Sequence, residues 1–307
     1  LYDLGVERRS VYALSRAEKG LIVTKEVLAR RWGIGMDTAY RTLRVTTQRG
    51  VRTFMHPTER RLSTHLPHLS FPMLRDSKVY SDTMFAKVKS IRKHSCAQNW
   101  TDGKGYTLFY PMRAKSEAPS TVARMVQDMK AIPEVIVTDG AMEERGRAFE
   151  AEVRKIRSKH HVTEPYSQWQ NRAEREIQEL KKSIKRTTIR SRSPRRLWCY
   201  CGEWVAAIRR LTAHDNPALN GLTAEEHVHA RTPDISAYAM FDWYQPVWYI
   251  DPAEGLEPRR KLGRWIGVAE HFGAPMCYFV LPKSGRPIAR SSVFHVTKED
   301  MLLMETQ

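Results

Sequence analysis

The chain has 307 residues, enough for two or three small domains, and 41% of them are hydrophobic, so a sizeable core can form. Lys and Arg number 51 against 34 Asp and Glu, which gives a net charge of +17 at pH 7. This excess favours a nucleic-acid partner, because a basic surface releases the counterions condensed on phosphate backbones. We expect no membrane-spanning segment and no cleaved secretion signal, since neither pattern is present.

The four cysteines indicate a reducing compartment. No two of them form a C-x-x-C pair, so the sequence predicts neither disulfides nor a cysteine-based zinc site. They are Cys96, Cys199, Cys201 and Cys277. The chain begins with Leu, as expected of a segment cut from a longer polyprotein.

The first 70 residues predict a helical module. Thr24 and Asp37 are expected to cap two helices on either side of the Gly33-Ile34-Gly35 turn. The side chains expected to face inward are Val27, Leu28, Trp32, Ala39, Tyr40 and Leu43. Two short helices around such a turn are typical of a helix-turn-helix, in which Arg41 and Arg44 would contact DNA. A helical hairpin that does not bind DNA has the same pattern.

Residues 75–235 predict a layered α/β domain. Strands are expected over residues 78–85, 95–101, 106–112, 135–137 and 161–162, and helices over 117–131, 144–159 and from 167 onward. The sequence Asp102-Gly103-Lys104-Gly105 favours a hairpin turn. The order β-β-β-α-β-α-β-α is that of the ribonuclease H-like fold, a mixed five-stranded sheet flanked by helices.

Further elements follow this core. Helices are predicted over residues 197–213 and 224–229, and residues 240–307 predict a small β-barrel. Its strands are expected over residues 247–250, 264–268, 276–280 and 293–296.

Three acids occupy places that suit catalysis. Asp82 lies inside the first predicted strand, where a charge is costly, and Asp139 ends the fourth. Glu174 lies near the start of the third helix of the core. The first and fourth strands of a ribonuclease H-like sheet are neighbours, so their two carboxylates should approach each other, with the helix bringing the third acid over both.

Clustered carboxylates repel one another and are stable mainly when they hold cations. Oxygen ligands favour Mg²⁺ or Mn²⁺, which complete their coordination with water and phosphate oxygens. Two such ions about 4 Å apart can activate an attacking hydroxyl and stabilise the leaving oxygen of a phosphoryl displacement. The three acids therefore predict a metal-dependent nuclease or strand-transfer site.

Two motifs around these acids resemble those of copia-type LTR retrotransposon integrases, and more broadly of retroviral integrases. Val137-Thr138-Asp139-Gly140 is similar to the family signature sDNG, and residues 165–175 are similar to P-x-x-x-x-x-N-G-x-x-E-R. Residues 261–268 and 291–294 are similar to the G-x-F-x-G and R-x-V-x-F segments after the copia core. The resemblance covers about residues 75 to 297.

The resemblance implies 3′-end processing and strand transfer into host DNA, with Asp82, Asp139 and Glu174 as the metal-binding triad. It also implies a homo-oligomer on paired double-stranded DNA ends, and Asn171 and Arg172 as residues that seat the DNA end. The basic run after Glu174 is expected to bind DNA and to serve as a nuclear-import signal, after a cytoplasmic particle stage. Its DNA-binding side chains are expected to be Arg175, Lys181, Lys182, Lys185 and Arg186.

The sequence departs from the family pattern in three ways. Gly140 stands where the family has Asn, Arg172 stands where it has Gly, and no N-terminal His-His-Cys-Cys module is present. Two alternatives remain open at this point. One is another ribonuclease H-like transposase or nuclease, and the other is a catalytically decayed DNA-binding protein derived from an element.

Overall fold

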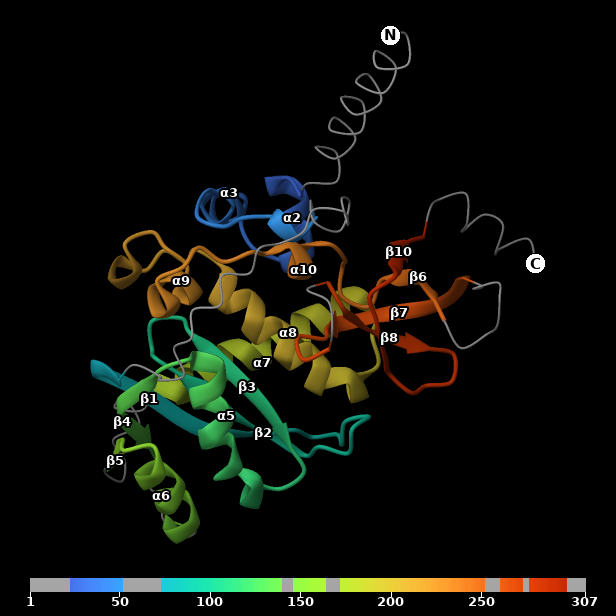
Figure 1. Ribbon diagram of the computed structural model, residues 1–307. Helices are drawn as coiled ribbons and strands as arrows, with labels where there is room; N and C mark the ends of the chain where they lie inside the picture. Colours follow the sequence, from blue (N-terminus) through green and yellow to red (C-terminus); the bar gives the residue numbers. More distant parts are fainter. Residues whose placement is uncertain are drawn as a thin grey trace, which may run out of the picture. The chain divides into compact units, whose positions relative to one another are not determined.

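A computed structural model of the protein describes residues 23–51, 73–139, 146–163, 172–251, 260–272 and 276–296 (Figure 1). The chain divides into two compact units. One is continuous, His65–Arg231, and the other combines Leu1–Thr64 with Thr232–Gln307.

The continuous unit contains a mixed five-stranded sheet. Its strands are β1 (Met73–Phe85), β2 (Cys96–Thr101), β3 (Thr107–Met112), β4 (Ile132–Thr138) and β5 (Lys159–Val162). The order across the sheet is β3-β2-β1-β4-β5. The β1–β2 and β2–β3 pairs are antiparallel, whereas β1–β4 and β4–β5 are parallel. The predicted neighbourhood of the first and fourth strands is therefore confirmed.

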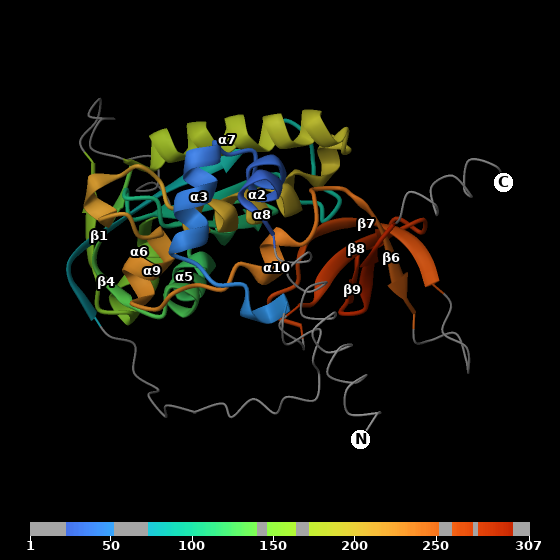
Figure 2. The ribbon, with the colours of Figure 1, turned by 90° about the horizontal axis from the view of Figure 1, so that it is seen from above.

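Helices cover both faces of this sheet. The elements are η1 (Lys115–Glu117), α5 (Ser120–Met129), α6 (Gly146–Lys155), α7 (Arg172–Ser191), η4 (Arg195–Leu197), α8 (Trp198–Leu211), η5 (Pro217–Leu219) and α9 (Ala224–His229). Helix α5 buries the apolar stripe predicted from its sequence, namely Val122, Met125, Val126 and Met129. Helix α7 lies on the opposite side of the sheet from α5 (Figure 2).

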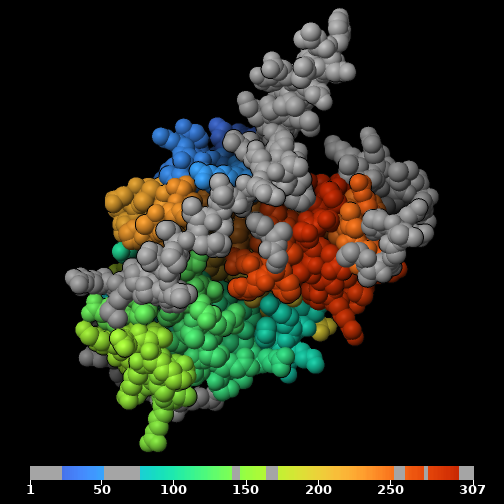
Figure 3. Space-filling view, in the orientation of Figure 1, coloured from blue at the N-terminus to red at the C-terminus, as the bar shows by residue number. Residues whose placement is uncertain are grey.

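Alternation along the strands separates the two faces. On the α5 face, Trp100 stacks on Phe149 of α6 and donates from Nε1 to Thr121 Oγ1 at 3.1 Å. On the α8 face, the Phe109 ring meets Trp198 edge-on, with ring centroids 6.3 Å apart. Figure 3 shows α5 and α6, in green, at the surface of the continuous unit.

The close packing of α8 on β3 depends on a glycine. A Cβ at Gly202 would overlap the Phe109 ring, which is buried and cannot move away without disturbing Trp198. We expect Gly202→Ala to lower the free energy of unfolding by about 1–3 kcal/mol, because overpacking forces such shifts. Urea denaturation measures this, with Gly146→Ala as control, since Glu150 Oε1 is its nearest neighbour at 3.9 Å. Equal stability of the Gly202 variant and wild type would contradict the packing argument.

The second unit joins the N-terminal helices to a separate antiparallel sheet. Its helices are α2 (Lys25–Trp32), α3 (Met36–Arg44) and α10 (Ser236–Ala239). Its strands are β6 (Pro246–Ile250), β7 (Arg260–Val268), β8 (Tyr278–Pro282), β9 (Ile288–Arg290) and β10 (Val293–His295). Their order is β10-β6-β7-β8-β9. The short strand β9 was not among those predicted from the sequence.

Hydrogen bonds within this unit join the helical module to residues 233–238, which precede the predicted module 240–307. The backbone N–H of Thr47 donates to Pro233 O, and that of Ile235 donates back to Thr47 O, each at 2.9 Å. Trp32 Nε1 donates to Tyr238 O at 3.2 Å. These bonds satisfy polar groups of the helical module with backbone atoms from beyond residue 232.

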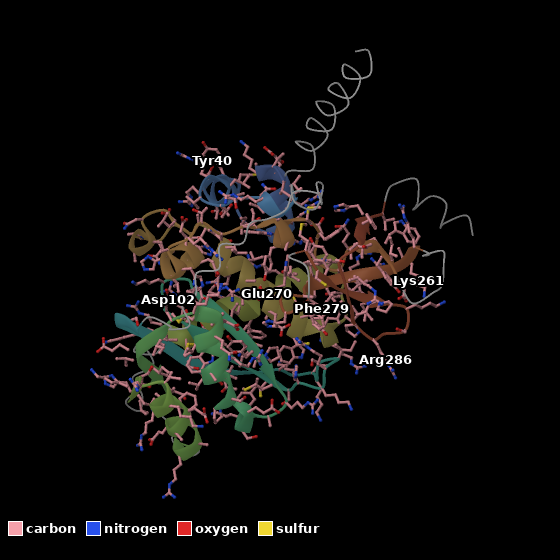
Figure 4. The ribbon with its side chains drawn as sticks, viewed as in Figure 1. Tyr40, Asp102, Lys261, Glu270, Phe279 and Arg286 are labelled. Atoms are coloured by element: carbon pink, nitrogen blue, oxygen red, sulfur yellow. The ribbon has the colours of Figure 1, made fainter. Side chains whose placement is uncertain are left out.

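Local details of the helical module differ from the sequence predictions. Thr24 lies at the N-cap of α2 but makes no side-chain cap hydrogen bond, and Gly35 rather than Asp37 occupies the N-cap of α3. Tyr40, predicted to face inward, is 52% exposed (Figure 4). The Arg44 guanidinium lies over its ring at 5.9 Å, so this aromatic side chain is covered by a cation rather than by the core.

The described residues were also compared with the predictions about membrane spans and cysteines. No described helix is long and apolar enough to cross a membrane. All four cysteines are buried free thiols. For Cys201 and Cys277, burial raises the pKa of the thiol, so both are held in the protonated, unreactive form.

Candidate functional site

The strand register brings Asp82 and Asp139 together. In the parallel β1–β4 ladder, Ser81 pairs with Thr138, and each aspartate is the next residue along its strand direction. Register mates on adjacent strands point to the same face of a sheet. The two carboxylates therefore lie side by side at the carboxyl end of β4, as expected from the sequence.

Glu174 approaches this pair of aspartates from α7. It lies half-buried in the first turn of this helix, which packs on β1 and β2. Its charge contributes to the electrostatic environment of Asp82, although less than that of Asp139. Asp82 and Asp139 therefore form the centre of the site, and Glu174 acts on Asp82 through its charge from α7.

Burial and repulsion shift the titration of Asp82. Burial of the carboxyl is the largest cause, and the neighbouring Asp139 charge adds to it, so the pKa of Asp82 rises to about 6. Glu174 raises this pKa further, whereas Lys115 and a hydrogen bond from Thr83 N to Asp82 Oδ1, 2.6 Å long, lower it. At neutral pH the ionised site is therefore electrostatically strained.

This shift predicts a pH-dependent stability in the absence of metal. Because the folded pKa of Asp82 exceeds the unfolded value of 3.8, its stabilising contribution is complete below 3.8 and is lost as pH rises through about 6. We expect the unfolding free energy of Asp82→Asn, relative to wild type, to increase by about 2 kcal/mol between pH 4.5 and pH 7.5. Urea denaturation in EDTA at the two pH values measures it. A constant difference would contradict the shift.

The donor set suits a hard divalent cation. Asp139 Oδ1 is buried and has no hydrogen-bond partner among the described residues, and all ligands offered are carboxylate oxygens. In the part of the chain that the structure describes, no three His, Cys, Asp or Glu side chains are close enough to hold one ion. The donors that the fold itself places together are therefore Asp82 and Asp139, with Glu174 farther away.

A cleft of about 930 Å³ opens beside Glu174. The start of α7, the β2–β3 turn and the segment after α8 line it, and its basic side chains include Lys104, Arg172 and Arg175. On its floor, Arg209 Nε and Glu176 Oε1 form an ion pair at 2.6 Å, and Glu176 also accepts from Thr107 Oγ1 at 3.0 Å. These bonds hold α7 against α8 and β3.

The β2–β3 turn is the hairpin predicted from the sequence. Asp102 Oδ1 accepts from the backbone N–H groups of Lys104, Gly105 and Tyr106 at 2.7, 3.1 and 3.0 Å (Figure 4). Gly103 has a positive φ of 70°, which a residue without Cβ adopts at no cost. The turn presents Lys104 to the cleft.

Arg172 is accommodated by this turn. Its side chain passes so close to Gly103 that a Cβ there would lie 2.5 Å from Arg172 Cδ. Its guanidinium lies over the Tyr80 ring at 5.8 Å. Tyr80 is two residues before Asp82 on the same strand, so Arg172 fixes the start of α7 next to the carboxylate site.

The predicted basic residues of α7 lie on its exposed side. Those exposed are Arg172, Arg175, Lys181, Lys182, Lys185 and Arg186. The buried stripe of the helix is Ala173, Ile177, Leu180 and Thr187. Lys182 pairs with Glu179 at 2.8 Å, a surface ion pair that a phosphate can replace at little cost.

Only some of the remaining residues predicted to contact DNA lie within the described part of the chain. Arg44 is exposed on α3, whereas Arg41 is half-buried and donates to Thr38 Oγ1 at 3.5 Å. Asn171 and Gly140 lie outside the described residues.

Sequence reasoning missed three residues of this region. Lys115 acts electrostatically on Asp82, and Arg209 holds Glu176. Asn99 lies opposite Asp82 in the β1–β2 ladder. None of the three carries a local signal, because the predicted strand over residues 95–101 also contains Ser95, Gln98 and Thr101, so a further polar residue in it is not distinctive.

Comparison with known sequences found no match, and comparison with solved structures found a distant similarity. The sequence matches no protein-family model and no curated protein. The structure is similar to a chain in the cryo-EM structure of the simian T-cell lymphotropic virus intasome in complex with PP2A regulatory subunit B56 gamma. The identity is 13% and the TM-score 0.38, over 73% of this chain and 83% of that chain. At this level the similarity carries no functional assignment.

Proposed function

We propose that the chain is the integrase of a copia-type LTR retrotransposon, a metal-dependent enzyme that processes the 3′ ends of element DNA and joins them to host DNA. The observation that carries this proposal is the pairing of Asp82 with Asp139 next to the carboxyl end of β4, with Glu174 in the first turn of α7, whose charge acts on Asp82. The order of strands in the mixed sheet supports assignment to the ribonuclease H-like fold.

Within this proposal the carboxylates hold Mg²⁺ or Mn²⁺. Asp82 and Asp139 would be ligands, and Glu174 would be the third. Two ions bound there would supply the charge that activates an attacking oxygen and stabilises a leaving one. The residues of the chain hold these ligands in place, through the Thr83 N–H bond to Asp82 and the packing of α7 on the sheet.

Basic side chains around the acids suit a phosphodiester substrate. Lys104, Arg172 and Arg175 border the cleft beside Glu174, and the lysines of α7 continue along its exposed side. Such side chains orient DNA through its phosphates without reading sequence. We propose double-stranded DNA as the partner, a homo-oligomer as the assembly and the nucleus as the place of action.

A strand-transfer assay tests the proposal. The full chain is incubated with Mg²⁺, a short DNA duplex ending in a recessed 3′-hydroxyl, and a circular target. Joined products that disappear in EDTA support integration. Hydrolysis without joining would indicate that the protein is a nuclease instead. DNA binding without either reaction would indicate that it is a DNA-binding protein.

A further inference from the structure

The most unusual polar group near the carboxylates is the amide of Asn99 in β2. Asn99 is 0% exposed, and both Nδ2 and Oδ1 are buried without a hydrogen-bond partner among the described residues. Leaving a buried polar group unsatisfied costs about 1–3 kcal/mol, so an apolar side chain of similar size would be more stable here.

The neighbouring amide shows that β2 can satisfy a buried side chain. Gln98, on the opposite face, donates from Nε2 to Ser81 Oγ at 2.6 Å and accepts from Thr83 Oγ1 at 2.8 Å. Among the described residues, no such partners lie against Asn99 on its own face. Its amide is therefore available to a group other than the side chains that the structure describes around it.

The register places Asn99 beside Asp82. The two residues are directly opposed in the antiparallel β1–β2 ladder, which puts their Cβ atoms about 5 Å apart on one face. That face is covered by α7, since Arg172 lies over Tyr80 and Glu176 accepts from Thr107 on the same side. Asn99, Asp82 and Asp139 thus form a row across β2, β1 and the end of β4.

We propose that Asn99 is a positioning residue, whose amide Nδ2 donates a hydrogen bond to the Asp82 carboxylate when that site holds a divalent cation. The inference rests on the proposed function. Carboxylates that ligate metals are themselves held by hydrogen bonds, and loss of such a partner weakens metal binding. Thr83 N already donates to Asp82 Oδ1, and Asn99 supplies the second donor.

Two substitutions of the same shape test this role. Asn99→Val removes the donor, whereas Asn99→Thr keeps a hydroxyl donor in a side chain of nearly equal volume. For each full-length variant, Mn²⁺ affinity is measured by calorimetry without DNA, and thermal unfolding is measured without metal. Gln98→Leu is the matched control on the other face of the strand.

We expect Asn99→Val to weaken Mn²⁺ binding by about 10–100-fold while keeping or raising the unfolding temperature. Asn99→Thr should bind Mn²⁺ within about threefold of wild type, since a hydroxyl can replace the amide donor. Gln98→Leu should lower the unfolding temperature and leave Mn²⁺ affinity unchanged, because it removes the acceptor of the Thr83 hydroxyl and a donor to the Ser81 hydroxyl.

A lower unfolding temperature of Asn99→Val with unchanged Mn²⁺ affinity would overturn the inference and make Asn99 structural. Asp82→Asn, titrated in parallel, separates this failure from that of the proposed function. If wild type binds Mn²⁺ no better than Asp82→Asn, the metal site itself is wrong. If binding depends on Asp82 but not on Asn99, only the positioning role fails.

Discussion

Asp139→Asn and Glu174→Gln should each reduce strand transfer by about three orders of magnitude. Each removes one carboxylate charge from the proposed metal site, and a bound cation contributes several kcal/mol of transition-state stabilisation, about 4 kcal/mol for this loss. The folded state should survive, because Asp139 Oδ1 makes no hydrogen bond among the described residues that an amide would lose. Joined product per hour in Mg²⁺ measures the effect.

A surface carboxylate on the other side of the sheet provides the control. Glu152 on α6 pairs with Lys155 at 2.6 Å in a surface ion pair, so Glu152→Gln should leave the rate unchanged. Circular dichroism of each variant verifies that the fold is retained. Strand transfer that persists at the wild-type rate in Asp139→Asn would rule out the carboxylate mechanism.

DNA affinity should fall about 10³-fold or more between 50 and 200 mM salt. A protein that contacts six or more phosphates through Lys and Arg loses affinity on this scale, because fewer counterions are released as salt rises. The exposed bases of α7 supply such contacts, among them Lys181, Lys185 and Arg186. Fluorescence anisotropy with an unspecific duplex at four salt concentrations gives the slope.

The contribution of α7 to the salt dependence of DNA affinity can be measured separately. The double variant Lys181→Ala/Lys185→Ala should reduce the slope of log affinity against log salt by about 2, one for each lost phosphate contact. Lys155→Ala, on α6 across the sheet, should not change it. A salt-independent affinity in wild type would remove DNA phosphates as the partner of this basic chain.

Local sequence patterns were sufficient to predict those elements whose structure depends mainly on their own residues. The apolar residues of α5 recur at helical spacing, and that face is buried whatever packs on it. Asp102 and the two glycines after it form a hairpin turn through bonds within five residues. The same reasoning was wrong for Tyr40, because an aromatic side chain one residue from a buried alanine can be covered by a nearby arginine instead.

Sequence by itself therefore determined the five-stranded α/β core, its amphipathic helices and the identity of three acids worth testing. Tertiary structure decided which of these groups meet. The approach of Asp82 to Asp139 depends on the β1–β4 register, and the union of the N-terminal helices with residues beyond 232 depends on backbone hydrogen bonds. Both link residues distant in sequence, so no local pattern encodes them, and the approach of the two aspartates was expected only from the element order of the whole domain. The unsatisfied amide of Asn99 also becomes visible only when its neighbours across two strands are known.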